Sequence, residues 1–304
     1  MEASEEKKVF NFNFMSSFII KIIAILTMTI DHVGVVMQMY SVNLELAEVF
    51  RIIGRIAMPL FCFMIAEGVI HTKSFGKYIL RMGIIATLVL IAQIAMEYLS
   101  KPLLGYKIVM YQGGIFFDLI LGAIAVKLLM DKRIWMKLLF IIPLGIGVAS
   151  FICFCYEVGG GEIYALPYYL RTQYGFISIL LIIGFYLAYK MYPLLMKMFN
   201  MDPSLYEGTN VERFAINVTS VVIFVILSVL YYLLGFMLDN MNFNHFYAFW
   251  DPSQQNYMLF SSAFVLLYSG KRGYNSKWFK YGQYLYYPVH ILIIYALFSL
   301  IIGG

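Results

Sequence analysis

Apolar stretches long enough to cross a lipid bilayer recur along the whole 304-residue chain. A transmembrane helix needs about 20 mostly apolar residues to cross roughly 30 Å of hydrocarbon. The stretches predict helices near residues 14–40, 50–70, 78–99, 113–130, 134–155, 173–192, 213–238, 256–270 and 283–302. The sequence therefore predicts an all-α, polytopic transmembrane bundle of about nine (8–10) helices.

The composition agrees with a lipid environment. Hydrophobic residues make up 62% of the chain and charged residues 13%, and the mean hydropathy is +0.79. A water-soluble domain of this size cannot hide so much apolar surface, so an ordinary soluble enzyme, a disordered chain and a disulfide-stapled small domain are excluded. Helices are favoured over a barrel because the stretches lack strand alternation. Since no repeat or soluble segment interrupts the pattern, we expect a single membrane-embedded domain over residues 1–304.

Lysine and arginine are distributed unevenly among the predicted loops. If the amino terminus is cytoplasmic, fifteen of them fall in the amino-terminal tail and in loops near 71–81, 131–137, 190–213 and 271–282. The opposite loops hold three. Cytoplasmic loops carry the excess of positive charge in membrane proteins, so we expect a cytoplasmic amino terminus.

Cysteine usage and the first apolar stretch exclude two other interpretations. Cys62, Cys153 and Cys155 form neither an even disulfide framework nor a C-x-x-C pair, and we expect no metal site. The first stretch lacks a small-residue cleavage pattern and is interrupted by Asp31 and His32. It is therefore interpreted as a retained helix and not as a signal peptide.

Ionisable residues within the predicted spans are candidate functional residues, because burying charge in lipid is costly. Counting residues along the helices places a polar group in the outer third of the bundle: Asp31, His32, Arg51, Arg55 and Asp118, with Gln93 as a further member. A second group is expected nearer the inner face: Lys21, Glu67, His71, Tyr287 and His290.

Helical spacing suggests a role for His32. Lys21 and His32 are eleven residues apart, close to three turns, so they share one face of the first helix. This arrangement predicts a polar track that ends at an imidazole suited to proton abstraction. Asp31 and Asp118 are rival candidates to pair with His32. The alternative is a structural network, for example Asp31 with Arg55, that joins helices.

Three blocks of sequence carry a family resemblance: KIIAILTMTIDHVG (21–34), FRIIGRIAMPLFCFMIAEGVIHTKSFGKYILR (50–81), and LLYSGKRG followed by YGQYLYYPVHILIIY (266–295). In this order they closely resemble the TraX family, integral membrane proteins named for the acetylation of conjugative pilin. A central segment resembles the family's D-Y-G-x-x-G, but Gln173 replaces Asp and Ser178 replaces the second Gly. Another resembles N-x-F-F-T-L-x-L-G, with Asp118 where Thr is common.

The TraX family in turn looks distantly similar to the acyltransferase-3 and heparan-glucosaminide acetyltransferase group. In acyltransferase-3 proteins the first helix carries Arg-x10-His, and the histidine is implicated in catalysis. Lys21 and His32 reproduce that spacing, with Lys in place of Arg.

The resemblance implies a membrane acyltransferase of the bacterial cytoplasmic membrane, which moves an acetyl group from cytoplasmic acetyl-CoA to a hydroxyl or amine. His32 would be the general base, with Asp31, Arg51 and Arg55 completing the catalytic group. Asp118 and Gln93 would face the acceptor, which is a peptide amine, a glycan or a lipid headgroup. The residues expected to hold acetyl-CoA are Lys21, Glu67, His71, Lys73, Lys271, Arg272, Tyr287 and His290.

Two other functions compete with this hypothesis. A proton-coupled transporter or flippase would use Asp31, His32, Glu67 and Asp118 as a relay, although we find no repeated halves or paired broken helices. A non-catalytic scaffold would use the same charges only to join helices. Nucleic-acid binding is not expected, because the cations are dispersed in a topology pattern.

Overall fold

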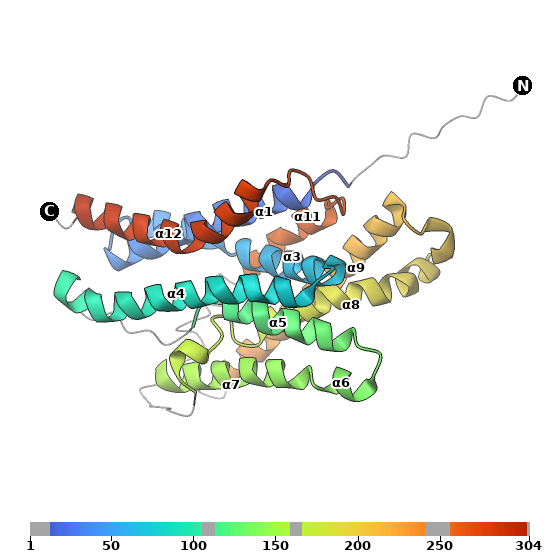
Figure 1. Ribbon diagram of the computed structural model, residues 1–304, viewed down its shortest axis with the longest axis horizontal. Helices are drawn as coiled ribbons and strands as arrows, with labels where there is room; N and C mark the ends of the chain where they lie inside the picture. Colours follow the sequence, from blue (N-terminus) through green and yellow to red (C-terminus); the bar gives the residue numbers. More distant parts are fainter. Residues whose placement is uncertain (1–12, 105–112, 159–165, 241–255, 303–304) are drawn as a thin grey trace, which may run out of the picture.

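The computed structural model describes residues 13–104, 113–158, 166–240 and 256–302. The described chain is a bundle of helices, many of which run lengthwise in Figure 1. The α-helices are α1 (Ser17–Met39), α2 (Leu44–Gly54), α3 (Ala57–His71), α4 (Phe75–Leu104), α5 (Ile115–Leu129), α6 (Ile134–Leu138), α7 (Ile141–Val158), α8 (Ile177–Met198), α9 (Asn210–Asn240), α11 (Ser261–Leu266) and α12 (Lys277–Ile302). Short 3-10 helices lie at Tyr168–Leu170, Pro203–Tyr206 and Asn256–Phe260.

Six helical segments of the described chain are long and apolar enough to cross a membrane: Ser17–Met39, Leu44–His71, Phe75–Ala95, Ile134–Glu157, Ile177–Met198 and Asn210–Leu238. The predicted all-α, polytopic membrane architecture is thus confirmed. The spans expected near 113–130 and 283–302 are also helical, as α5 and α12, but their apolar parts are shorter.

The span expected at 50–70 is divided between α2 and α3. The helix is interrupted at Arg55 and Ile56, and α3 resumes at Ala57. Pro59 lies in the first turn of α3, where it has no amide hydrogen to donate to Arg55 and its ring crowds that carbonyl. The predicted span is thus confirmed as part of Leu44–His71, but the sequence did not predict its division into two helices.

The span expected at 256–270 is likewise not one helix. It consists of the 3-10 helix Asn256–Phe260 and the six-residue α11, followed by extended chain. This extended chain lies beside the segment before α1, because Met15 N donates to Leu267 O at 2.9 Å and Ser269 N donates to Met15 O at 2.8 Å. The amino-terminal and carboxy-terminal thirds are thereby joined at one end of the bundle.

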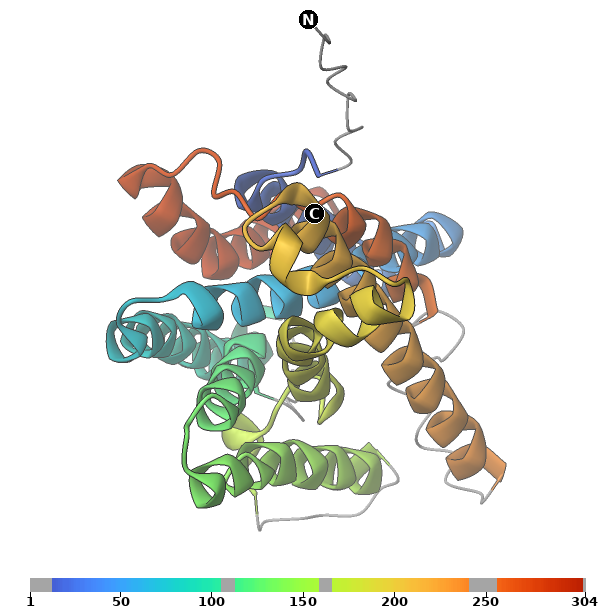
Figure 2. The same ribbon diagram turned by 90° about the vertical axis from the view of Figure 1, so that its right-hand side faces the viewer.

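The core lies between α3, α5 and α8, which occupy the middle of the bundle in both views (Figures 1 and 2). Gly122 of α5 allows close packing, since a Cβ there would lie 2.3 Å from a side-chain atom of Ile182 on α8. α9 and α4 instead present many exposed apolar side chains, such as Ile226, Leu230 and Leu88. Exposed apolar faces on long helices are what a lipid environment requires.

Candidate functional site

Asp31 of α1 binds two arginines at the α2–α3 break. Arg51 Nη1 donates to Asp31 Oδ2 at 2.7 Å, and Arg55 Nη2 donates to Asp31 Oδ1 at 2.8 Å. Arg55 Nε also donates to the carbonyl of Arg51 at 3.0 Å. The alternative of an ion-pair network around Asp31 is therefore what the structure contains. Asp31 does not serve as the hydrogen-bond partner of His32.

Two glycines make this network possible by bringing α1 and α2 together. A Cβ on Gly54 would lie 2.2 Å from Cβ of Asp31, and one on Gly34 would lie 2.9 Å from the carbonyl oxygen of Ala47. Either clash would push the helices apart. The close approach places both guanidinium groups within hydrogen-bond distance of one carboxylate.

His32 pairs with His290 of α12. Nδ1 of His32 lies 2.7 Å from Nε2 of His290, and Nδ1 of His290 lies 2.8 Å from the carbonyl oxygen of Tyr286. A carbonyl oxygen only accepts, so Nδ1 of His290 carries the hydrogen and, in neutral His290, Nε2 accepts from Nδ1 of His32. This polarity leaves Nε2 of His32 as an unprotonated acceptor. The depth count expected His290 nearer the inner face, and the structure places it beside His32 instead.

Tyr286 keeps His290 in place. The two rings stack with centroids 4.8 Å apart, and the Tyr286 hydroxyl lies 2.7 Å from Oγ1 of Thr29. Thr29, His32 and their partners thus form a polar seam between α1 and α12.

Asp118 is the buried acid of α5, and its oxygens are already used. Gln173 N and Tyr174 N donate to it at 2.7 and 2.8 Å, and Ser178 Oγ donates at 2.8 Å. Asp118 therefore holds the start of α8 and is not the partner of His32. Gln93, the other expected member of the acceptor layer, is half-buried near Gly114, within 3.7 Å of where a Cβ on that glycine would lie.

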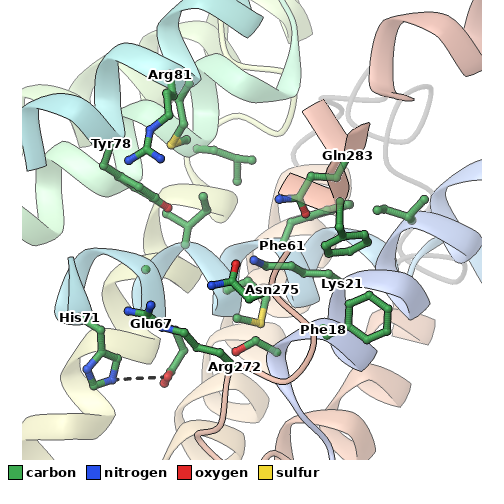
Figure 3. A pocket seen from close by; sticks show the side chains of 18 of the residues that line it. Phe18, Lys21, Phe61, Glu67, His71, Tyr78, Arg81, Arg272, Asn275 and Gln283 are labelled. Atoms are coloured by element: carbon green, nitrogen blue, oxygen red, sulfur yellow. Dashed lines mark ion pairs between the residues drawn. The ribbon is translucent and has the colours of Figure 1, made fainter. Parts of the chain in front are cut away.

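A cavity of about 660 Å³ lies beside the part of α1 that precedes His32 (Figure 3). It extends from the start of α1, at Ser17 and Phe18, to Met28, which is one turn before His32. Walls also come from α3, α4, α5, α12 and the chain between α11 and α12. This volume is in the range of pockets that bind small ligands.

Three cations from separate elements line the cavity. They are Lys21 of α1, Arg81 of α4 and Arg272 of the loop before α12, and in Figure 3 Arg81 faces the other two from the opposite side. Two residues expected to bind the same ligand, Lys73 and Lys271, are exposed and do not line the cavity. The cavity thus has the positive charge that an anionic ligand needs.

Glu67 is the only acid among the described lining residues, and its charge is compensated. Arg213 Nη2 donates to Glu67 Oε1 at 2.9 Å, and Tyr189 donates to the same oxygen. His71 lies one turn on, with Nε2 3.6 Å from Glu67 Oε2. The sequence missed Arg213 and Tyr189. Arg213 was counted as a loop cation, whereas it lies in the first turn of α9, over the ring of Tyr268 at 4.4 Å.

Tyr287 separates the cavity from the histidine pair. It lines the cavity and is buried, whereas neither His32 nor His290 is a lining residue. Its ring lies edge-on to Phe116, His32 and His290, with centroids 4.9, 6.4 and 5.7 Å away. A ligand in the cavity can therefore contact Tyr287, whose ring packs against that of His32.

Comparison with known proteins supports the resemblance seen in the sequence. A curated relative, a probable fimbrial assembly protein FimC of serogroup H1 from Dichelobacter nodosus, is 30% identical over 116 residues. The match spans 37% of this chain and 46% of the relative, so less than half of that protein is covered. No solved structure matches. The family model for the TraX protein matches residues 16–298, which include the ion-pair network, the histidine pair and the cavity, and the chain therefore belongs to the TraX family.

Proposed function

We propose that this protein is a membrane acyltransferase, which moves an acetyl or similar acyl group from CoA to a hydroxyl or amine acceptor. The observation that carries the proposal is a cationic cavity lined by Tyr287, whose ring lies edge-on to that of His32 with centroids 6.4 Å apart. His32 pairs with His290 through Nδ1, which leaves its Nε2 as the proton acceptor. The phosphates of CoA would bind among Lys21, Arg81 and Arg272, and the thioester arm would extend toward Tyr287.

The chemistry requires one proton acceptor. The acceptor's hydroxyl or amine gives its proton to Nε2 of His32 as its oxygen or nitrogen bonds to the acyl carbon. The carbon–sulfur bond of the thioester then breaks, and the departing CoA thiolate takes the proton from His32. Every atom is accounted for without a metal or a redox partner. His290 acts as a positioning residue, because it orients His32 by accepting from its Nδ1.

Asp31, which precedes His32 in α1, supports this centre together with its partners Arg51 and Arg55. Both guanidinium groups are fixed on Asp31, so they contribute a preorganised positive potential near His32. A negative charge that develops on the thioester oxygen would be stabilised by such a field.

The acceptor class follows from the family and the relative. Family membership and the relative's description as a fimbrial assembly protein support an acceptor among exported surface components. A peptide amine, a glycan and a lipid headgroup satisfy the chemistry. The enzyme would act in the bacterial cytoplasmic membrane, within the lipid bilayer.

The proposal is tested with purified protein in detergent or vesicles. Acetyl-CoA should raise the melting temperature, and release of free CoA should be lost in His32→Ala, with Lys197→Ala, on an exposed turn of α8, as the control. Arg272→Ala should raise KM more than Lys271→Ala, because Arg272 lines the cavity and Lys271 does not. Equal effects of these neighbouring cations, or proton-coupled uptake into vesicles without thioester turnover, would contradict the proposal.

A further inference from the structure

Three aromatic rings gather at the open end of the cavity. Phe18 of α1 lies 5.4 Å from Tyr274 and 4.7 Å from Phe279 of α12, measured between ring centroids. All three line the cavity, and Tyr274 is 63% exposed. An exposed, ring-lined mouth is a surface on which a flat aromatic ligand stacks.

The loop that carries Tyr274 is fixed on the start of α1. Phe18 N donates to the carbonyl of Arg272 at 3.1 Å, and Ser17 N donates to that of Lys271 at 2.8 Å. Gly273 has φ of +69°, and a Cβ there would lie 2.3 Å from Oγ of Ser16. Gly273, the second glycine of the sequence block SGKRG, thus lets the loop pack closely against the start of α1. This packing places the Arg272 cation next to the rings.

Polar side chains complete this end of the cavity. Asn275 and Gln283 line it together with Lys21 and Arg272, and all four are labelled in Figure 3. Carboxamides both donate and accept hydrogen bonds, which suits the edge of a purine base. The rings and carboxamides suit a base and the cations suit phosphates, so this end of the cavity has groups for both the base and the phosphates of a nucleotide.

We propose that Phe18, Tyr274 and Phe279 form a subsite for the purine base of a phosphorylated nucleotide, whose phosphates bind Arg272 and Lys21. The inference rests on the proposed function, since it assigns the nucleotide half of the acyl donor to the cavity mouth and the thioester half to the Tyr287 end. Stacking tolerates any base, so the site selects a base-bearing ligand over a bare anion.

Another aromatic side chain of α12, Trp278, lies outside the cavity and provides a control. Trp278 is 90% exposed and does not line the cavity, as expected of a side chain at the membrane interface. It lies between Lys277 and Phe279 in sequence, so Trp278→Ala is a matched control for loss of an aromatic residue at this end of α12.

The test is binding of adenosine 3′,5′-bisphosphate to the full-length protein, measured by thermal shift and calorimetry. We expect it to bind more tightly than pyrophosphate, and Tyr274→Ala to weaken it about tenfold, with Tyr274→Phe and Trp278→Ala close to wild type. Arg272→Ala should weaken both ligands. Equal affinity for pyrophosphate and the nucleotide, or wild-type nucleotide affinity in Tyr274→Ala, would overturn the subsite.

The outcome separates the subsite from the acyltransferase function. Nucleotide binding without turnover of acetyl-CoA leaves the subsite in place and contradicts the proposed function. Turnover of acetyl-CoA with no affinity for the bisphosphate contradicts the subsite alone. S-acetylpantetheine, which lacks the nucleotide, should react equally well in wild type and Tyr274→Ala. If Tyr274→Ala slowed its reaction as much as that of acetyl-CoA, this result would also count against the subsite.

Discussion

At the scale of single residues, the histidine pair divides two roles between similar side chains. In the proposed mechanism His32 accepts the proton at Nε2, and His290 fixes the hydrogen on Nδ1 of His32. Removing a general base lowers kcat more than removing the residue that positions it. The pair therefore predicts unequal losses for the two substitutions.

We expect His32→Ala to lower kcat by at least about 100-fold, and His290→Ala by about 10- to 100-fold, with KM for acetyl-CoA unchanged in both. The reason is that neither ring lines the cavity that would hold the donor. Steady-state kinetics on folded protein checks this split. A large rise in KM for His290→Ala would place His290 in donor binding instead.

Three residues that depart from the family pattern contact one another in the structure. Asp118 stands where Thr is common, whereas Gln173 and Ser178 stand where Asp and Gly are common. In the structure these positions meet, because Asp118 accepts from Gln173 N and from Ser178 Oγ. This chain thus has its carboxylate on α5, facing the start of α8, whereas the family pattern given above has an Asp at the start of α8 itself.

This arrangement predicts a strong coupling between the two positions. Asp118→Thr alone should lower the free energy of unfolding by about 2 kcal/mol, since it leaves buried donors unsatisfied. Adding Gln173→Asp and Ser178→Gly should recover most of that loss, because the acid returns on the opposite helix. Thermal unfolding of the single and triple variants measures the coupling, and additive losses would contradict it.

At the scale of helices, the contact between α1 and α2 depends on Gly54. Gly54→Ala should destabilise the fold by about 1–3 kcal/mol, since the added methyl overlaps Asp31 and pushes α2 away from it. Gly83→Ala on α4 is the control, as nothing lies within 4 Å of its Cβ position and alanine favours the helix. Melting temperatures of the two variants should move in opposite directions; a shared direction would argue against helix contact as the cause.

The sequence predicted elements far better than it predicted contacts between them. Apolar length located α1, α8 and α9 closely, because lipid demands long helices wherever the chain crosses. It predicted the span that α2 and α3 form but not the break between them, where the local effect of Pro59 interrupts a continuous apolar pattern. At 256–270 it extended the helix too far, because after Leu266 backbone pairing with the segment before α1 replaces it.

The candidate site was predicted by residue type but not by partner. His32 and Asp31 stood out because ionisable groups are rare in apolar helices, and the pairing of Asp31 with an arginine was an open alternative. The His32–His290 contact joins residues 258 positions apart, and helical spacing carries no information on which helices pack together. Arg213 was hidden for a different reason, since a cation at a helix start looks like a loop charge until the packing of α3 and α8 buries it.

At the scale of the whole molecule, the orientation in the membrane decides which compartment the cavity faces. The Lys- and Arg-rich loops predict that the end bearing Lys132 and Lys197 is cytoplasmic, and Glu45 at the start of α2 would lie on the opposite side. Lys132→Cys and Lys197→Cys should react with a membrane-impermeant maleimide only in inverted vesicles, and Glu45→Cys in intact cells. Cys155→Ser protein gives the background, because Cys155 is half-buried whereas Cys62 and Cys153 are buried. Labelling of Lys197→Cys in intact cells would reverse the orientation.

Tyr287 contacts both parts of the candidate site, since it lines the cavity and its ring packs edge-on against both histidine rings. An enzyme with an activated thioester must keep water from the base until the acceptor is present. Tyr287→Ala opens the cavity onto His32, so we expect hydrolysis of acetyl-CoA without acceptor to rise at least several-fold relative to transfer. Tyr287→Phe keeps the ring against Phe116 and should retain the wild-type ratio. Free CoA and acetylated acceptor, measured in the same reactions, give the ratio directly, and an unchanged ratio in folded Tyr287→Ala would show that this ring does not separate donor from base.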